Sequence, residues 1–340
     1  MSRSRRIIPI VTAPSELAKR DATQRQRLWW QMGFFILFAL APWFDLLRYD
    51  LNAGHAWLLT FEWHLGLDDF LAGRASAASA AANVLLRLFV PIVIGAAIFI
   101  GIAWRWGRLY CGWLCPHFSV VETINRLMLL ATGKPSLWEA RALASRQPDG
   151  SVRHADRRAW LLVVPLAVFF ALLWAVVLLS YLMPPLEMYP RLVSLSLQRY
   201  EAVFVGAATV VLSLEFLLAR HLFCRYACAV GMFQSLAWMA NRKALVVGVD
   251  RARLAECADC LHGEGSACEA ACPMRLKPRS IKRLMFACTQ CAQCLSACAT
   301  VQADNPQGSL LAWVQGEEAR QLEGGFKAPR PARCRGDGEG

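Results

Sequence analysis

Eight closely spaced cysteines in the last third of the chain are the most specific chemical signal in the sequence. They follow the patterns C-x2-C-x7-C-x3-C-P and C-x2-C-x2-C-x3-C. The second pattern has the spacing of bacterial ferredoxins, in which three neighbouring thiolates hold one cluster and the fourth reaches the other. The spacing therefore predicts two 4Fe-4S clusters. We assign one to Cys257, Cys260, Cys268 and Cys298, and its neighbour to Cys272, Cys288, Cys291 and Cys294.

The first cysteine pattern departs from the ferredoxin spacing. Its seven-residue gap, from Leu261 to Ala267, contains Gly263 and Gly265 and is long enough to form a loop. Zinc is the alternative for sets of four thiolates. Interleaved C-x2-C-x2-C-x3-C sets rarely serve zinc, so iron–sulfur clusters are the preferred interpretation.

Two further cysteine pairs have identical spacing and similar surroundings. Cys111 and Cys115 lie in RLYCGWLC, and Cys224 and Cys228 lie in HLFCRYAC. Residues four apart share one face of a helix, so each pair brings two sulfurs together. Soft thiolates select Cu(I), so such a site would favour reduction of Cu(II). The alternative is four buried cysteines that act as small apolar side chains.

Histidines and methionines near these pairs are secondary candidates. His117 and His221 lie beside the C-x3-C motifs and are candidate copper ligands or proton donors, although an interfacial histidine is commonly just solvated. Met232 and Met239 are candidate thioether ligands, with packing as the simpler use. Cys334 stands alone in a Gly-, Arg- and Pro-rich tail, 323–340, whose composition argues against a ninth cluster ligand.

The elements that would position these cysteines are membrane helices. The 340 residues are 56% hydrophobic with a mean hydropathy of +0.34, which exceeds the apolar content of soluble proteins. Apolar runs long enough to cross a bilayer predict four spans. We place them at 28–44, 84–106, 159–182 and 202–218 and expect an all-α membrane domain, with a cytoplasmic ferredoxin-like segment after it.

Charge distribution predicts the topology. Residues 1–27 and 107–158 carry seven and eight Lys and Arg, whereas 46–83 and 183–201 carry two each. The positive-inside rule then places both termini in the cytoplasm of a multi-pass protein of the bacterial inner membrane. Anionic lipid headgroups account for the net charge of +12, so no nucleic-acid partner is expected. Every cysteine falls on the cytoplasmic side, where metal ligation is favoured over disulfides.

These observations divide the chain into five segments. A basic N-terminus, 1–27, precedes the transmembrane domain, 28–221, which contains the cytoplasmic loop 107–158. The second C-x3-C motif and a connector occupy 222–250. The two-cluster domain, 251–305, is followed by a partly disordered tail, 306–340. The two C-x3-C motifs, each after an outside-to-inside helix, predict parallel repeats related by an axis along the membrane normal.

From about residue 20 to 315 the sequence resembles the CcoG family, also called FixG or RdxA. The resemblance rests on Cys111-Gly112-Trp113-Leu114-Cys115-Pro116, on Cys224-x3-Cys228 with Phe233-Gln234-Ser235, and on the two cluster motifs. It implies a membrane iron–sulfur protein that assists assembly of cbb-type cytochrome oxidase and reduces Cu(II) to Cu(I) at the C-x3-C cysteines. Ala229 stands where the family usually has proline, and the Ig-like C-terminal domain of that family is not expected here.

Three functions follow as hypotheses. The first is an oxidoreductase, a cupric reductase, that takes electrons from a cytoplasmic donor and passes them through the clusters to copper at Cys111, Cys115, Cys224 and Cys228. Cytochrome oxidase assembly factors would be its partners. The second is a NapH-like or NosR-like module between quinol and a partner reductase. The third is a non-enzymatic copper-binding assembly factor. The sequence does not predict an oligomeric state.

Overall fold

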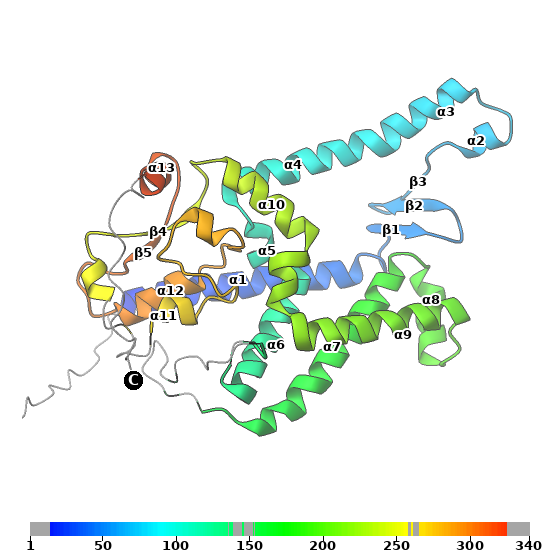
Figure 1. The fold of residues 1–340 in the computed structure, drawn as a ribbon. Coiled ribbons are helices and arrows are strands. Elements are labelled where there is room, and N and C mark those ends of the chain that lie inside the picture. The colour runs from blue at the N-terminus through cyan, green and yellow to red at the C-terminus, as the bar shows by residue number, and fades with distance from the viewer. Residues whose placement is uncertain are drawn as a thin grey trace, which may run out of the picture.

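The computed structural model describes residues 14–134, 136–138, 145, 152, 154–257, 260 and 265–324, and the chain is mostly helical (Figure 1). Three helices are long and apolar enough to cross a membrane: Ala77–Trp106, Arg157–Ser180 and Arg199–Ala219. They correspond to the expected spans at 84–106, 159–182 and 202–218. Three of the four predicted spans are thus confirmed as apolar helices of sufficient length.

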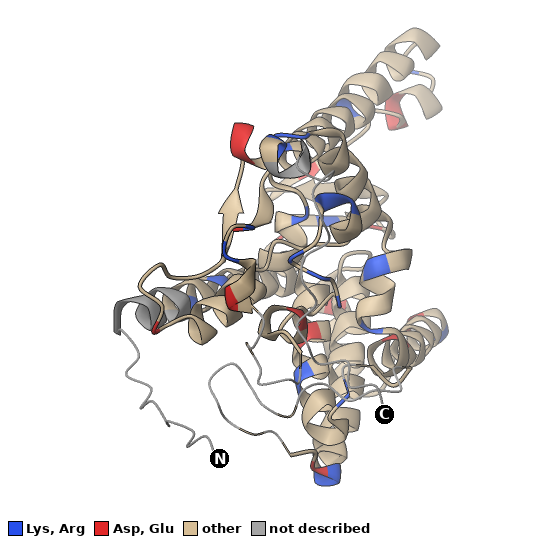
Figure 2. Cartoon of the chain, turned by 60° about the vertical axis from the view of Figure 1, so that its left-hand side comes forward, with Lys and Arg blue, Asp and Glu red and all other residues tan. Residues whose placement is uncertain are grey.

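Each of the three helices is assembled from shorter elements. The first joins α3 (Ala77–Val84), the π-helical turn η1 (Leu85–Phe89) and α4 (Val90–Trp106). The second joins η2 (Arg157–Ala159) to α7 (Trp160–Ser180), and the third joins α9 (Arg199–Leu214) to the π-helical turn η3 (Glu215–Ala219). Lys and Arg lie mainly away from the middle of these helices (Figure 2). That pattern suits apolar contact along their length.

The fourth expected span, 28–44, falls on α1 (Pro14–Leu40), which is not among the three apolar helices. Charged and polar residues, including Arg25 and Arg27, occupy its first half. Even so, α1 runs from the cysteine-rich part of the chain to the opposite end (Figure 1). There the hydroxyl of Tyr181 donates a hydrogen bond to the carbonyl oxygen of Phe38, at 2.8 Å. Its membrane crossing stays a prediction.

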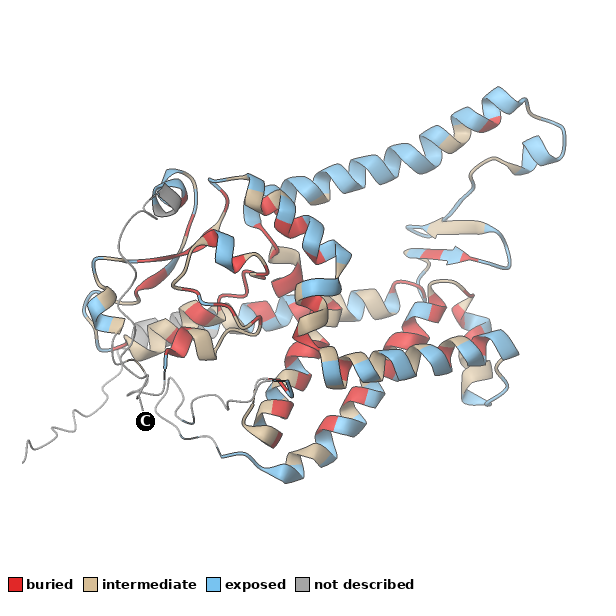
Figure 3. Cartoon of the chain, viewed as in Figure 1, coloured by how far each residue is buried: buried red, intermediate tan, exposed pale blue. Residues whose placement is uncertain are grey.

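The helices differ in how much protein covers them (Figure 3). Helices α7 and α9 pack on each other, and small residues such as Ala167, Ala171 and Ala175 are fully buried between their neighbours. In contrast, the most apolar window of Ala77–Trp106 has no buried residue. An apolar helix without protein cover needs another apolar medium around it, which a bilayer provides.

The end of the molecule away from most cysteines contains a small sheet that the sequence analysis did not predict. It is formed by β1 (Leu47–Asp50), β2 (His55–Leu58) and β3 (Phe61–Trp63), all antiparallel, with Leu47 opposite Leu58. Short helices α2 (Asp68–Leu71) and α8 (Pro185–Val193) lie at the same end (Figure 1). The expectation of an all-α membrane domain is corrected here.

A second sheet closes the cysteine-rich unit and was also missed. Strand β4 (Val246–Val249) pairs with β5 (Leu311–Val314), so residues before and after the cluster motifs are joined. Between them lie η5 (Leu254–Cys257), α11 (Ala267–Ala270), η6 (Lys282–Met285) and α12 (Gln293–Val301), and α13 (Glu317–Gly324) follows. Both β5 and α13 lie in the segment that the sequence assigns to a tail.

Candidate metal centres

The first C-x3-C motif lies in a tight connection between two helices. After α4 ends, Gly107 has a φ of +69°, a conformation that favours glycine. The short helix α5 (Leu109–Trp113) then carries Cys111, and Cys115 is the N-cap of α6 (Pro116–Thr132). The backbone N–H of Cys115 donates to the carbonyl oxygen of Tyr110, at 2.9 Å. Proline at the first position of α6 suits this abrupt helix start.

The second motif repeats the same construction 113 residues later. Arg220 takes the place of Gly107 with a φ of +46°, η4 (Phe223–Ala227) carries Cys224, and Cys228 is the N-cap of α10 (Ala229–Ala240). The N–H of Cys228 donates to the carbonyl oxygen of Phe223, again at 2.9 Å. The predicted repeat is therefore present in the local backbone.

Direct hydrogen bonds join the two motifs. Sγ of Cys111 donates to Oε1 of Gln234 on α10, at 3.2 Å, and Nη2 of Arg108 donates to the carbonyl oxygen of Cys224, at 2.8 Å. Gly231 leaves room for this arginine, because a Cβ atom there would lie 2.1 Å from its Nη2. The first repeat thus reaches into the second, and both first cysteines are 6% exposed.

The thiols of the motifs influence one another electrostatically. Burial, together with the charges of Cys111 and Cys228, raises the pKa of Cys115 to about 12. Burial also raises the pKa of Cys111, although the neighbouring Arg108 guanidinium partly offsets this. The structure therefore brings the four motif cysteines into one neighbourhood. A soft metal bound here would have to displace the thiol protons.

The predicted ligands of one cluster surround a single small cavity. Cys272, Cys288, Cys291 and Cys294 all line it, together with Pro273. Gln290 and Ala292, the residues on either side of Cys291, have φ values of +54° and +59°. Such left-handed residues curl the backbone tightly. The N–H of Leu276 points at Sγ of Cys272, at 3.4 Å, as hydrogen bonds to cluster sulfurs do. These residues fit the proposed cofactor.

The other predicted set, Cys257, Cys260, Cys268 and Cys298, has Arg279 beside it. Burial raises the pKa of Cys268 to about 12; the charge of Arg279 acts to lower this pKa and that of Cys257 acts to raise it. Nη1 of Arg279 lies 3.5 Å from Sγ of Cys257. Helices α11 and α12, which carry Cys268 and Cys298, pack together. Cys260 is described, but 258–259 and 261–264 of the long gap lie outside the described residues, as does Cys334. All twelve described cysteines are free of disulfides.

In the described ranges, no group of three His, Cys, Asp or Glu side chains is arranged as a single-ion site. A 4Fe-4S cluster binds one thiolate at each of four iron corners, so its ligands stand further apart than those of one ion. Four thiolates around a cavity suit that cofactor. When bound, the cluster supplies reversible one-electron transfer.

The C-x3-C turns lie directly against the cluster loops. A Cβ atom on Gly112 would lie 2.1 Å from the carbonyl oxygen of Thr289, and Nε1 of Trp113 donates to the carbonyl oxygen of Gln290, at 2.9 Å. In the other repeat, Nη1 of Arg225 donates to the carbonyl oxygen of Met274, at 3.4 Å. Each repeat therefore contacts one of the two cysteine loops.

A continuous apolar core connects the same regions. Cys224 and Cys115 pack in one cluster of side chains with cysteines of the ferredoxin-like unit: Cys268, Cys272, Cys288, Cys294 and Cys298. Such a core excludes water between the two kinds of site. Cysteines of the C-x3-C motifs and of the ferredoxin-like unit therefore share one apolar core.

Several candidates from the sequence have other surroundings than expected. His117 lies 3.4 Å from Oε1 of Glu215, between the rings of Phe216 and Phe223, and His221 is buried. Sequence analysis missed Arg108, Gln234 and Gly112 as parts of the site. All three stand within motif sequences quoted above, but those sequences do not indicate the contacts that the residues make.

The comparisons with known proteins agree with this geometry. A protein family described as "4Fe-4S binding domain" matches residues 88–135 and 202–245, which are the two C-x3-C repeats and their helices. It does not cover the cysteines from 257 to 298. Each matched segment contains one C-x3-C motif, so the family pattern recognises both copies of the repeat.

Two curated relatives are distantly similar. "Regulatory protein NosR" of Stutzerimonas stutzeri is 25% identical over 197 residues, which cover 56% of this chain and 22% of NosR. "Putative electron transport protein YccM" of Escherichia coli (strain K12) is 24% identical over 230 residues, 67% of this chain and 56% of YccM. The chain spans little more than half of one relative and about a fifth of the other. No solved structure matches it.

The fold and the cysteine sites define a class of protein, a helical, membrane-associated protein with a 4Fe-4S binding domain. Within that class, the chain is similar to NosR and YccM. These relatives do not confirm the resemblance to the CcoG family specifically.

Proposed function

We propose that this protein carries electrons between two 4Fe-4S clusters and a second redox centre formed by Cys111, Cys115, Cys224 and Cys228. The observation that carries the proposal is the packing of Gly112 on Thr289. It joins the turn of one pair of cysteines to the loop of Cys288 and Cys291. Electron tunnelling falls steeply with distance, so direct contact between the two loops favours exchange.

The chain's own residues would give the clusters their environment. The first cluster takes Cys257, Cys260, Cys268 and Cys298, and the second takes Cys272, Cys288, Cys291 and Cys294. Burial and N–H groups directed at sulfur, as at Cys272, are features that set the reduction potential of such clusters. The guanidinium of Arg108 lowers the pKa of both Cys111 and Cys288 against the effect of burial, so one positive charge acts on both centres.

The proposed topology has four crossings and both termini in the cytoplasm of the bacterial inner membrane. The basic segments 1–27 and 107–158 support this orientation through the positive-inside rule. Support for α1 as the fourth crossing comes from two contacts along it. Nε2 of Gln24, in the first half of the helix, donates to the carbonyl oxygen of Cys291, and the carbonyl oxygen of Phe38, near the C-terminal end, accepts from the hydroxyl of Tyr181. A cytoplasmic donor would then reach the clusters directly.

The centre at the four motif cysteines has two candidate contents. Soft thiolates suit copper, and one electron from a reduced cluster would convert Cu(II) to Cu(I). That is the cupric reductase hypothesis, with cytochrome oxidase assembly factors as recipients. The match of a 4Fe-4S family to both repeats supports a third cluster instead. The similarity to NosR and YccM supports the NapH-like or NosR-like role in electron transport at least as well as copper reduction.

Metal content separates these candidates. Protein purified anaerobically would contain about eight iron atoms per chain with two clusters and about twelve with three. Cys272→Ser and Cys298→Ser would each remove about four. The quadruple Cys→Ser variant at the two C-x3-C motifs would keep the same eight iron atoms as the intact protein if those cysteines bind copper, and would fall from about twelve to about eight if they hold a third cluster. Cys334→Ser is the control and would change nothing.

Electron transfer tests the function itself. The dithionite-reduced protein is mixed with Cu(II), and Cu(I) is trapped with a chromogenic chelator, in the intact protein and in the quadruple variant. Equal rates reject copper reduction at the motifs, and Cu(I) binding without turnover supports the assembly-factor hypothesis. A protein without any 4Fe-4S signal in electron paramagnetic resonance rejects the proposal as a whole.

A further inference from the structure

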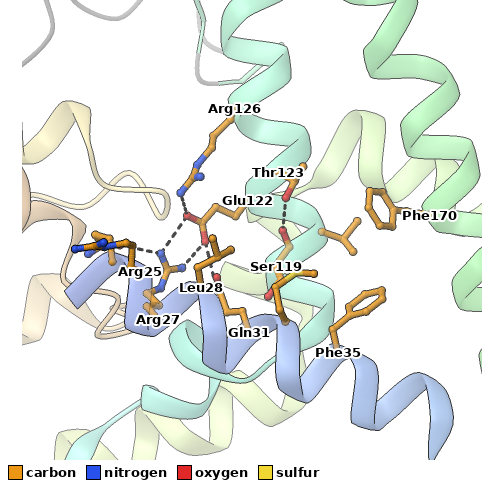
Figure 4. Close-up of a pocket in the computed structure, with 13 residues that line it drawn as sticks. Arg25, Arg27, Leu28, Gln31, Phe35, Ser119, Glu122, Thr123, Arg126 and Phe170 are labelled. Atoms are coloured by element: carbon orange, nitrogen blue, oxygen red, sulfur yellow. Dashed lines mark hydrogen bonds and ion pairs between the residues drawn. The ribbon is translucent and has the colours of Figure 1, made fainter. Parts of the chain in front are cut away.

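A cavity of about 580 Å³ lies between α1, α6 and α7 (Figure 4). One part of its wall is apolar and includes Leu28, Met32, Phe35 and Phe170. The other part is polar and includes Ser119, Glu122, Thr123 and Arg126. Its size is within the range of small-molecule sites, and the division into two parts suits an amphipathic ligand.

The polar wall of this cavity touches both kinds of cysteine loop. Nε of Arg27 donates to the carbonyl oxygen of Gly112, at 2.7 Å, and Nε2 of Gln24 donates to that of Cys291, at 3.3 Å. A ligand in the cavity would therefore be separated from the Cys291 loop by single side chains. Such a place favours a ligand that exchanges electrons.

The polar groups offer both a donor and acceptors. Nη2 of Arg126 donates a hydrogen bond to Glu122, at 2.6 Å. The Arg126 side chain is 68% exposed, so its remaining N–H groups can reach a ligand. The hydroxyls of Ser119 and Thr123 donate to backbone carbonyl oxygens, so each keeps lone pairs to accept a hydrogen bond. Glu122 itself already accepts from Arg27, Gln31 and Gln293 as well as Arg126. Burial alone would raise its pKa, but the Arg27 guanidinium overrides this and lowers it.

We infer that this cavity binds a membrane quinone, with its ring against Ser119, Thr123 and Arg126 and its tail along Leu28, Met32 and Phe35. This inference rests on the proposed function, because the quinone is the partner of the clusters. A quinone oxygen accepts a hydrogen bond, whereas the corresponding quinol hydroxyl donates one. Arg126 can donate to the quinone oxygen, and the hydroxyls of Ser119 and Thr123 can accept from the quinol hydroxyl. The phosphate of a lipid only accepts hydrogen bonds, so its site would need donors alone.

The stoichiometry of the clusters suits this ligand. Two reduced clusters give one electron each, and the quinone takes both electrons with two protons from water at the mouth beside Arg126 to form quinol. Quinol oxidation is the reverse: two electrons reduce two oxidised clusters, and two protons return to water. No other reactant is required.

Tryptophan substitutions at the cavity test the site. Thr123→Trp and Met32→Trp replace partly or largely exposed lining residues and fill the cavity, whereas Leu130→Trp adds the same bulk to an exposed position of α6 outside it. Reduced protein is mixed with decylubiquinone, and cluster oxidation is followed by absorbance. The two cavity variants would react at least tenfold more slowly than Leu130→Trp and the unchanged protein. Ferricyanide, which needs no cavity, would oxidise all four proteins alike.

Photolabelling gives a readout that does not need loaded clusters. An azidoquinone would label peptides containing Met32 or Thr123, and excess decylubiquinone would suppress the label. Equal quinone rates in all variants, labelling elsewhere only, or a phospholipid that quinone does not displace in native mass spectrometry would overturn the site. If the proposed function itself is wrong and the protein holds no reducible clusters, the result is different: ferricyanide then oxidises nothing in any of the four proteins.

Discussion

The Cα atom of Gly112 faces the carbonyl oxygen of Thr289 so closely that an added Cβ atom would lie 2.1 Å from that oxygen. The two residues belong to different cysteine motifs, 177 positions apart. At these two residues, the backbone of the first C-x3-C repeat touches the backbone of the ferredoxin-like unit, with no side chain between them. Only glycine permits this approach, since any other residue must displace the carbonyl.

Gly112→Ala is therefore expected to push the ferredoxin-like unit away from the first repeat. Overpacking costs about 1–3 kcal/mol, and the wider gap slows electron transfer between the centres. The rate of oxidation through the C-x3-C cysteines should fall by an order of magnitude or more, with both cluster signals retained. Gly101→Ala is the matched control, because no atom lies within 4 Å of its added Cβ. If both variants react equally fast, this contact does not carry the electrons.

Arg108 is expected to control the acidity of Cys111. Its guanidinium opposes the effect of burial on the Cys111 pKa and also bonds to Cys224. In Arg108→Met the pKa of Cys111 should rise further, and each unit of increase lowers the thiolate fraction tenfold at a given pH. Alkylation of Cys111 in metal-free protein, followed by mass spectrometry from pH 7 to 10, measures this. Arg74→Met, at an exposed position, should leave the profile unchanged.

The metal-free protein should lose stability in alkaline solution. The pKa of Cys115 is about 12 in the folded chain against 9.0 ordinarily, because burial disfavours the thiolate. Above pH 9 the unfolded chain releases a proton that the folded chain keeps, so the free energy of unfolding falls with rising pH, by about 1.4 kcal/mol per unit and thiol. Melting temperatures between pH 8 and 11 should fall less steeply in Cys115→Ser. An unchanged slope would show that this thiol is not buried as described.

Features of the fold and the site could be predicted from the sequence where they depend on residues close together along the chain. The cysteine sets and three apolar helices were predictable, because spacing and length along the chain define them. The sheet of β4 and β5 was not, because strands of four residues separated by more than 60 positions have no local signature. The same holds for the contact between Gly112 and Thr289.

Arg27 illustrates the limit of reasoning from charge. The sequence analysis counts it among cytoplasmic basic residues facing lipid headgroups, but the structure buries it to 2% exposure in an ion pair with Glu122. Counting charges along a segment predicts the side of the membrane on which the segment lies. It does not predict whether a particular side chain is buried or exposed. Glu122 lies 95 positions away, on a helix whose packing against α1 depends on the whole fold.

Glu122 joins three elements, and its loss should therefore be costly. It accepts hydrogen bonds from Arg27 and Gln31 of α1, from Arg126 of its own helix and from Gln293 of α12. Glu122→Gln removes the negative charge and leaves the buried Arg27 guanidinium unpaired, which costs about 3–5 kcal/mol. The melting temperature should fall, and detachment of α12 should release iron. In the double variant Arg27→Met/Glu122→Leu, both charges are gone, so part of the stability should return. If the double variant is less stable than Glu122→Gln alone, the ion pair is not the reason for the loss, and the hydrogen bonds to α12 would be responsible instead.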